Sequence, residues 1–379
     1  MNQYELIATS TFGIEAVVKR ELIALGYKIV STENGKVTFL SDEAGIARAN
    51  LWLRSADRVL LKIGEFKATT FDELFDKTTA LDWAKYIPKD GKFDVNGKSV
   101  KSKLFSISDC QAIVKKSIVG SLKKEYKIDW FPESGANYDV LISILKDVAT
   151  LTIDTSGAGL HKRGYRIKNV EAPVKETLAA AMILLSYYSK DRVLYDVFCG
   201  SGTIPIEAAL IARNIAPGIS RDFASKHWDF IGNDIWKTET KKAYLAIDYD
   251  ADIKIYASDI SEKNLAAAIE NAEEAGVDDC IEFKVSDFND LILENNHGIV
   301  ISNPPYGERL SDDNEVKKMY RKLGNKFNSL DTWSKYYLTS FSEFEIYYNK
   351  KADRDRRLYN GRLEVKYYQY YGPRPPLKD

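Results

Sequence analysis

The first 60 residues alternate between strand-like and helix-like spacing of apolar positions. Apolar residues recur at helical spacing within 13–25, and strand-like runs lie at 4–10, 28–32 and 36–40. The Asn34-Gly35 pair between the last two runs indicates a hairpin. A helix over 43–54 and a strand over 58–66 complete the order. The pattern predicts a small α+β unit over residues 1–60.

Residues 67–155 predict a second α+β unit. It contains a strand-like segment at 92–102, a helix at 110–126 and a strand pair within 138–154. The stretch 98–127 is rich in lysine, and its helix carries Lys115, Lys116, Lys123 and Lys124. These four are candidate RNA contacts, and a solvated helix face is the competing interpretation.

The chain changes character at 156–176, where several glycines and a proline are mixed with basic residues. This stretch reads as a basic linker, and Lys162, Arg163 and Arg166 are further candidate RNA contacts. An apolar helix begins at about 174, and strands then alternate with helices to about 310. That alternation predicts a parallel, doubly wound sheet.

A glycine-containing turn at 198–203 carries the clearest chemical signal. A buried strand, Val193 to Val197, includes Asp196, and a helix follows the turn formed by Phe198, Cys199, Gly200, Ser201, Gly202 and Thr203. Ligands of open α/β sheets bind at the carboxyl ends of strands, and glycine allows a close backbone approach. Pro205 stands where a dinucleotide fingerprint has its third glycine, and no Gly-Lys-Ser/Thr triplet follows. An acid before such a turn suits a ligand with an amine and no phosphates, such as S-adenosylmethionine (SAM).

The next two strands also end in acids. Asp259, followed by Ile260, is expected to take the ribose hydroxyls, with Asp234 as a rival that more plausibly caps a helix. Residues 213–250 are then an insertion between the first helix and the second strand. Asp287 is expected to accept from the adenine amino group with Phe288 against the ring, although Asp287 also suits a turn.

The fourth strand, GIVIS, runs directly into Asn303-Pro304-Pro305-Tyr306. An exocyclic amine on a base is a poor nucleophile because its lone pair is delocalised into the ring. The Asn303 side-chain oxygen and the Pro304 carbonyl are expected to orient that amine and take up developing positive charge. Pro305 stiffens the turn, and Tyr306 offers a face for stacking a flipped base.

Composition narrows the class of protein. The chain has 379 residues with a net charge of −1, so RNA binding would have to come from a local patch. Three separate cysteines favour neither a metal site nor disulfides. No signal peptide or membrane-spanning run is recognisable, and the expected location is the cytoplasm.

The stretches GLHKRGYR, APVKETLAAA, DVFCGSGTIPIEAA, YASD and NPPYGERL together resemble the THUMP-domain-containing, SAM-dependent RNA guanine-N2 methyltransferases. The nearest group is the bacterial one that modifies large-subunit ribosomal RNA. The resemblance implies a ferredoxin-like unit over 1–60, a THUMP domain over 61–158 and a Rossmann-like methyltransferase domain over 159–379. It also implies that the segment containing Glu176 and Thr177 folds over the cofactor.

Two other functions stay open at this point. NPPY motifs also occur in adenine-N6 methyltransferases of DNA and RNA, so adenine is an alternative target. A catalytically inactive RNA-binding assembly protein is the third possibility, although the complete set of motifs weighs against it.

Overall fold

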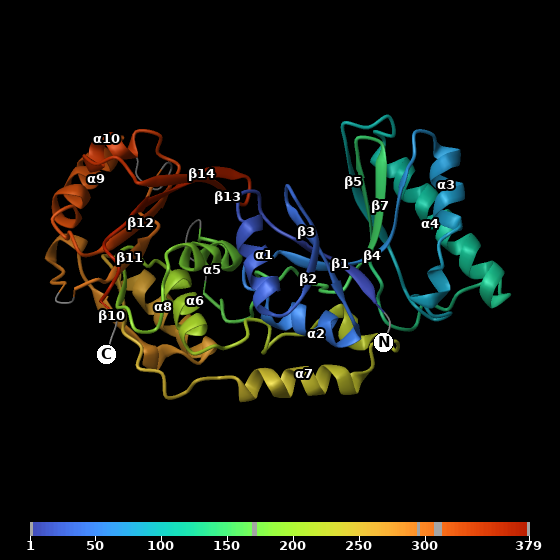
Figure 1. Ribbon diagram of the computed structural model, residues 1–379, viewed down its shortest axis with the longest axis horizontal. Helices are drawn as coiled ribbons and strands as arrows, with labels where there is room; N and C mark the ends of the chain where they lie inside the picture. Colours follow the sequence, from blue (N-terminus) through green and yellow to red (C-terminus); the bar gives the residue numbers. More distant parts are fainter. Residues whose placement is uncertain (1–2, 169–172, 294–295, 307–312, 377–379) are drawn as a thin grey trace. The chain divides into compact units, whose positions relative to one another are not determined.

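The computed structural model describes residues 3–168, 173–293, 296–306 and 313–376 (Figure 1). The chain forms two compact units. The first comprises Met1–Thr9, Lys19–Leu160 and Asp222–Lys242, and the second comprises Ser10–Val18, His161–Arg221 and Ala243–Asp379. Each unit therefore takes in a segment that sequence order alone would assign to the other.

The first unit is built on one seven-stranded sheet of order β2-β3-β1-β4-β7-β6-β5. Its strands are β1 (Tyr4–Thr9), β2 (Lys28–Glu33), β3 (Lys36–Ser41), β4 (Arg58–Lys67), β5 (Val95–Val100), β6 (Val140–Leu145) and β7 (Val148–Asp154). The first half of β4 pairs with β1, and most of its length pairs with β7. The two α+β units expected from the sequence thus share one continuous sheet through this long strand.

The helices of the first unit contribute buried apolar faces. They are α2 (Glu43–Trp52), α3 (Phe71–Thr79), α4 (Ile107–Tyr126), and most of α1 (Glu15–Ala24) and of α7 (Asn233–Leu245). In α4 the buried residues Cys110, Val114, Ile118 and Leu122 recur every four residues, so this face packs inward and the lysines face solvent.

The segment Asp222–Lys242, expected as an insertion, packs within the first unit. Trp228 stacks on Tyr138 with 4.9 Å between ring centroids, and its Nε1 donates to the Asn137 carbonyl at 2.9 Å. Asp234 lies in the first turn of α7 inside the helix, where it pairs with Lys237 at 3.6 Å. The expectation that Asp234 caps this helix is therefore wrong, because the helix begins one residue earlier, at Asn233.

The second unit is a doubly wound sheet, as predicted, of order β10-β9-β8-β11-β12-β14-β13. Its strands are β8 (Leu194–Asp196), β9 (Ile255–Asp259), β10 (Ile281–Val285), β11 (Ile299–Ser302), β12 (Ser334–Thr339), β13 (Arg354–Asn360) and β14 (Leu363–Tyr370). Strands β8 to β12 pair in parallel, and β14 pairs antiparallel with β12 and β13.

Helices cover both faces of this sheet. The helices are α5 (Glu176–Leu185), α6 (Thr203–Ala212), α8 (Glu262–Ala275), α9 (Asp313–Phe327) and α10 (Phe344–Tyr348). Side chains of α5, α6 and α8 form one core cluster with the sheet, and side chains of α9 and α10 form another. In Figure 1, α5, α6 and α8 lie on one side of this sheet, and α9 and α10 lie on the other. No helix in the described part of the chain is long and apolar enough to cross a bilayer.

Candidate active site

The site lies at the carboxyl ends of β8 and β11, where the strand order of the second sheet reverses. From β8 the chain proceeds to β9 and β10 on one side, whereas β11 and β12 lie on the other. Strands β8 and β11 are direct neighbours, with Leu194 opposite Ile299 and Tyr195 opposite Val300. Open α/β sheets bind ligands at such switch points. The motifs that follow these two strands are therefore brought side by side.

Asp196, the last residue of β8, has a buried carboxyl group in which only one of the two oxygens is hydrogen-bonded to described residues. Its Oδ1 accepts hydrogen bonds from the Ser302 hydroxyl at 2.7 Å and from the Phe198 backbone N–H at 3.2 Å. Its Oδ2 is buried and has no hydrogen-bond partner among the described residues. Burial raises the pKa of Asp196 to about 7. A positively charged donor placed at Oδ2 would supply the interaction that this carboxylate lacks.

Asp259 holds the glycine turn against β9. Its Oδ2 accepts from the Gly200 N–H at 2.9 Å, and its Oδ1 accepts from Ser261 N at 2.9 Å and Asn264 Nδ2 at 3.3 Å. A carboxylate offers about four acceptor positions, so these three bonds leave about one for a ribose hydroxyl. Asp259 thus has a structural role in addition to the predicted contact with the cofactor.

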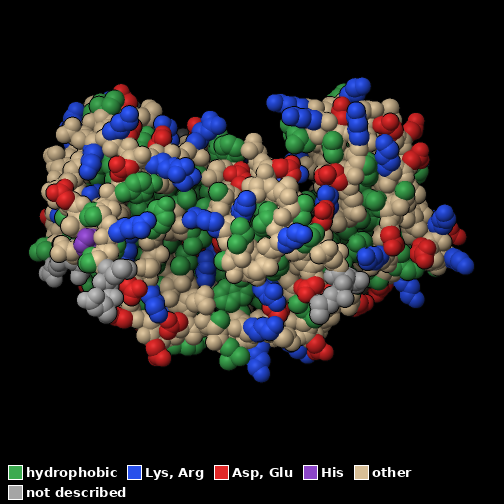
Figure 2. All heavy atoms as spheres, viewed as in Figure 1, with side chains coloured by type: hydrophobic (Ala, Val, Ile, Leu, Met, Phe, Trp, Pro, Cys, Tyr) green, Lys and Arg blue, Asp and Glu red, His purple; other side chains and the backbone are tan. Residues whose placement is uncertain are grey.

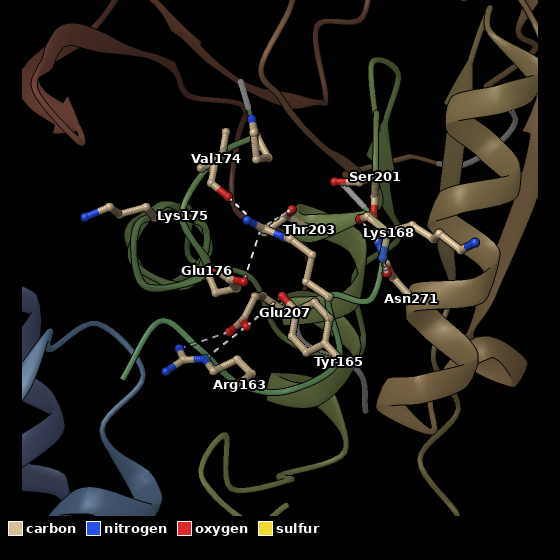
Figure 3. Close-up of polar contacts among 12 residues, drawn as sticks. Arg163, Tyr165, Lys168, Val174, Lys175, Glu176, Ser201, Thr203, Glu207 and Asn271 are labelled. Atoms are coloured by element: carbon tan, nitrogen blue, oxygen red, sulfur yellow. Dashed lines mark hydrogen bonds and ion pairs between the residues drawn. The ribbon is translucent and has the colours of Figure 1, made fainter. Parts of the chain in front are cut away.

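Gly200 and Gly202 both have a positive φ, at +54° and +82°, which favours glycine. A Cβ on Gly202 would lie 3.0 Å from Cβ of Ala268 in α8. Gly202 is thus required by the close approach of a helix, which is a different reason from the ligand approach expected from the sequence. Asn271, one turn further along α8, donates to the Ser201 carbonyl at 3.0 Å and fixes the turn from the same side (Figure 3).

Arg163 is not available to RNA, and this corrects the prediction made for it. Its side chain is 3% exposed and pairs with buried Glu207 of α6 at 3.2 Å (Figure 3). Tyr165 donates to the same carboxylate at 3.1 Å. Burying a charge is costly unless it is paired, so Arg163 anchors its segment to α6 and does not form part of a basic surface. Lys162 is exposed.

Arg166 is also directed inward and joins three parts of the site. One guanidinium nitrogen donates to the Val174 carbonyl and to Thr203 Oγ1, each at 2.8 Å, and lies 3.4 Å from the Glu176 carboxylate. Figure 3 shows Val174, Glu176 and Thr203 converging on this point. Glu176 Oε2 is buried without a hydrogen-bond partner among the described residues, and burial raises the pKa of Glu176. Thr177, the next residue of α5, is buried.

Asn303 lies directly after Ser302, whose hydroxyl also accepts from the Val197 N–H at 2.9 Å. The Asn303 side chain is buried, and its Oδ1 has no hydrogen-bond partner among the described residues. Pro304 is buried, and the Pro305 carbonyl accepts from Tyr320 at 3.3 Å. Tyr306 packs in the core cluster, so stacking of a base on it stays a prediction. The following Gly-Glu-Arg-Leu lies outside the described residues.

Asp287 and Phe288 follow β10 in a short 3₁₀ turn. Asp287 Oδ1 accepts from the Asn289 N–H and Nδ2, both at 2.8 Å, so the turn role expected as an alternative is present. Phe288 is buried and contacts Phe198, with 5.2 Å between ring centroids. Ile260, after β9, is 72% exposed, and an exposed apolar side chain at a strand end suits the face of a ring. Cys199 is buried, and burial raises the pKa of its thiol.

The predicted lysines on α4 belong to the first unit. Lys115, Lys116, Lys123 and Lys124 are exposed. Lys115 lies 3.2 Å from Asp94 and Lys123 lies 3.7 Å from Asp129, and Lys115 and Lys116 also lie over phenylalanine rings. Acidic neighbours thus partly neutralise this helix face.

Sequence reasoning missed Ser302 and Asn271. Asn271 had a signal, because it falls on the apolar face of α8 beside Ala268 and Ala272, where a buried amide needs partners. Ser302 had none, since a serine at a strand end gives no indication of which neighbouring strand it will bond. Among the described residues no cluster of metal-ligating side chains is present.

Comparison with known proteins identifies the family. The model described as the RMKL-like methyltransferase domain matches residues 163–369. The RlmL ferredoxin-like domain matches 5–60, and the THUMP domain matches 68–154. The chain belongs to the RMKL-like methyltransferase family. The predicted fold class, with ferredoxin-like and THUMP parts before a methyltransferase domain, is confirmed.

Known relatives of this RMKL-like methyltransferase are similar to it over nearly its whole length. "Putative RNA methyltransferase YpsC" of Bacillus subtilis strain 168 is 51% identical over 100% of this chain and 98% of its own length. "Ribosomal RNA large subunit methyltransferase K/L" of Shewanella baltica strain OS195 is 33% identical over 96% of this chain and 52% of its own. The chain therefore spans about half the length of the K/L proteins.

Two crystal structures are similarly close. A predicted N6-adenine-specific DNA methylase from Listeria monocytogenes str. 4b F2365 has 50% identity and a TM-score of 0.94, covering 98% of this chain and 97% of its own. SMU.472 complexed with SAH has 44% identity and a TM-score of 0.94, covering 99% and 100%. SAH is what remains of SAM after methyl transfer, and the predicted cofactor of this RMKL-like methyltransferase, SAM, is confirmed.

The residues of the second unit fit this cofactor. The unpartnered Asp196 Oδ2 suits the ammonium group of the methionine part, and the turn 198–203 lies next to it in the chain. Asp259, Ile260, Asp287 and Phe288 follow the adjacent strands β9 and β10, which places them on one side of β8. Asn303 lies on the other side of β8. This division suits a cofactor on one side and a methyl acceptor on the other.

Proposed function

We propose that the protein transfers a methyl group from SAM to the exocyclic N2 amine of a guanosine in RNA, with large-subunit ribosomal RNA as its substrate. The observation that carries the proposal is the buried Asn303 oxygen, unpartnered among the described residues, one residue after the serine that bonds Asp196. A buried amide oxygen that lacks a donor favours binding of an N–H group, and an exocyclic amine has two.

In the proposed reaction, some residues of the site orient the methyl acceptor and others hold the cofactor. When bound, SAM supplies an electrophilic methyl group. Asn303 Oδ1 and the Pro304 carbonyl accept from the two amine hydrogens and turn the nitrogen lone pair toward the methyl donor. They also stabilise the positive charge that develops on nitrogen, and that proton is lost to solvent after transfer. Asp196, the turn 198–203, Asp259, Asp287 and the segment at Glu176 and Thr177 hold the cofactor.

RNA as the substrate is supported by the THUMP match and by the names of the relatives. Guanine is supported by the resemblance of the NPPYGERL stretch to guanine-N2 enzymes. Adenine N6 is the second candidate, because the Listeria structure is described as an N6-adenine-specific methylase and Asn303 would accept equally from an adenine amine. Since ribosomal RNA is its proposed substrate, the protein would act in the cytoplasm.

The test is incubation of the protein with SAM and undermodified ribosomal RNA, followed by mass spectrometry of the nucleosides. N2-methylguanosine is the expected product. N6-methyladenosine would identify the second candidate, and absence of any methylated nucleoside, with SAM still bound, would favour an RNA-binding protein without activity. The same assay with DNA shows whether the target is confined to RNA.

A further inference from the structure

One end of the sheet in the first unit carries exposed apolar side chains. Val100 at the end of β5 pairs with Leu145 of β6, and Leu145 pairs with Val148 of β7. Paired residues lie on the same face of a sheet, so these three exposed side chains stand side by side. Phe105, in the loop after β5, is 84% exposed, the largest value for a large apolar residue in the described part of the chain.

The loop that carries Phe105 is fixed to the same strand ends. The Lys103 N–H donates to Asp147 Oδ1 at 2.7 Å, and the Asp147 N–H donates to Ser102 Oγ at 3.1 Å. Ser99 Oγ donates to the Leu104 carbonyl at 2.6 Å, and Leu104 is buried. The backbone on the N-terminal side of Phe105 is thus anchored while its ring remains in solvent. An aromatic held in this way loses little conformational entropy when a ligand covers it.

Exposed lysines surround these apolar side chains. They are Lys67 at the end of β4, Lys98 on β5, Lys101 and Lys103 in the loop, and Lys146 between β6 and β7. None of the five forms an ion pair with a described residue, whereas Lys115 and Lys123 on α4 both face aspartates. Figure 2 shows lysine and arginine side chains gathered at the edge of the sheet where β5 ends and β7 begins in the same view. The positive charge of this surface is therefore available to a ligand.

We propose that this strand-end surface, formed by Val100, Phe105, Leu145, Val148 and the five lysines, binds unpaired nucleotides of the RNA substrate. The proposal rests on the proposed function. Phe105 stacks on a base, and the lysines contact flanking phosphates. Apolar residues alone would suit a protein partner, but five unpaired lysines around them are complementary to a polyanion. An exposed aromatic among lysines suits single strands, because bases within a duplex are already stacked.

The test compares Phe105→Ala with Trp130→Ala. Trp130 is 75% exposed in the same unit, and the nearby Lys123 is paired with Asp129, so Trp130 is an exposed aromatic outside the surface with the five unpaired lysines. Binding is measured by fluorescence anisotropy with a labelled unstructured RNA and a duplex of equal length. Phe105→Ala is expected to weaken single-strand binding by about 5- to 100-fold, and Trp130→Ala to leave it unchanged. Both residues are exposed, so the thermal unfolding midpoint should not change.

A second variant tests the lysines. Lys101→Gln, Lys103→Gln and Lys146→Gln combined should reduce the slope of log affinity against log salt by about 2 for single-stranded RNA. If Phe105→Ala binds single-stranded RNA as well as Trp130→Ala does, the inference is wrong. If the wild-type protein binds no RNA at all, the proposed function itself fails, so the two failures are distinguishable.

Discussion

The Ser302 hydroxyl lies 2.7 Å from Asp196 Oδ1, and this hydrogen bond joins the end of β11 to the end of β8. The same hydroxyl accepts from the Val197 N–H at 2.9 Å. Asn303 follows Ser302 directly, and the glycine turn follows Asp196 after one further residue, Val197. The proposed methyl acceptor position and the proposed cofactor position are thus coupled through one buried serine.

Ser302→Ala should weaken SAM binding by about tenfold, because a hydrogen bond to a charged group contributes about 1.5–3 kcal/mol. Isothermal titration calorimetry measures the change. Ser258→Ala is the matched control, since Ser258 is buried on β9 and its hydroxyl has no hydrogen-bond partner among the described residues. Equal effects of the two substitutions would mean that the hydrogen bond to Asp196 does not contribute to cofactor binding.

SAM affinity should rise with pH between about 5.5 and 7. Burial raises the pKa of Asp196 to about 7, so at lower pH the carboxyl must lose a proton before it can pair with an ammonium group. Asp196→Asn should bind SAM more weakly and with little dependence on pH in this range. A pH profile that is the same in wild type and variant would show that another group titrates.

The raised pKa of Asp196 also makes the stability of the cofactor-free protein depend on pH, but stability falls as pH rises, whereas SAM affinity increases. Between the usual aspartate pKa, about 4, and the folded value, about 7, the folded protein holds a proton that the unfolded chain has released. The free energy of unfolding without cofactor therefore falls as pH rises through that window. Asp196→Asn should remove this part of the dependence, which denaturant titrations at pH 5 and pH 8 can measure.

Arg166→Ala should raise the KM for SAM by about tenfold while leaving kcat at saturating SAM within about twofold. The reason is that Arg166 holds Val174, Glu176 and Thr203 in place without occupying the proposed acceptor position. Arg166→Lys should restore part of the affinity. Lys168→Ala is the control, because Lys168 lies in the same segment but pairs at the surface with Glu270. A fall in kcat with unchanged KM would contradict the positioning role.

Gly202→Ala should destabilise the protein by about 2–3 kcal/mol. Alanine at a φ of +82° is strained by about 1 kcal/mol, and its Cβ would press on Ala268 at 3.0 Å. Gly276→Ala separates the two causes, since Gly276 has a φ of +66° and an added Cβ there would meet nothing within 4 Å. It should cost only the strain. The stability of both variants is measured by thermal unfolding. An equal loss of stability in the two variants would contradict a close approach of Ala268 to Gly202.

The sequence predicted the second unit well because its signals are local. A buried strand, a glycine turn and an apolar helix follow one another at 193–212, and NPPY directly follows its strand. The pairing of β8 with β11 follows from the doubly wound pattern, so it could be anticipated that Asp196 and Asn303 lie at the ends of neighbouring strands. Their link through Ser302 could not, because it depends on the direction of one side chain.

The prediction that Arg163 contacts RNA failed because the sequence showed its charge but not its burial. Arg163 looked like part of a basic linker, but its partner Glu207 lies 44 residues later in the chain, on an apolar helix where sequence gives no pairing signal.

The packing of Asp222–Lys242 in the first unit depends on contacts such as that of Trp228 with Tyr138, across about 90 residues. Long-range contacts of this kind are not encoded in local periodicity.

The central claim is that Asn303 holds the amine that receives the methyl group, and Asn303→Ala tests it most directly. Single-turnover methyl transfer to undermodified ribosomal RNA is measured at saturating SAM and RNA, with SAM affinity measured separately. We expect transfer to N2 of guanosine to fall by about 100-fold or more, with the Kd for SAM within about twofold of wild type. Transfer at a rate near that of the wild-type protein would contradict the account.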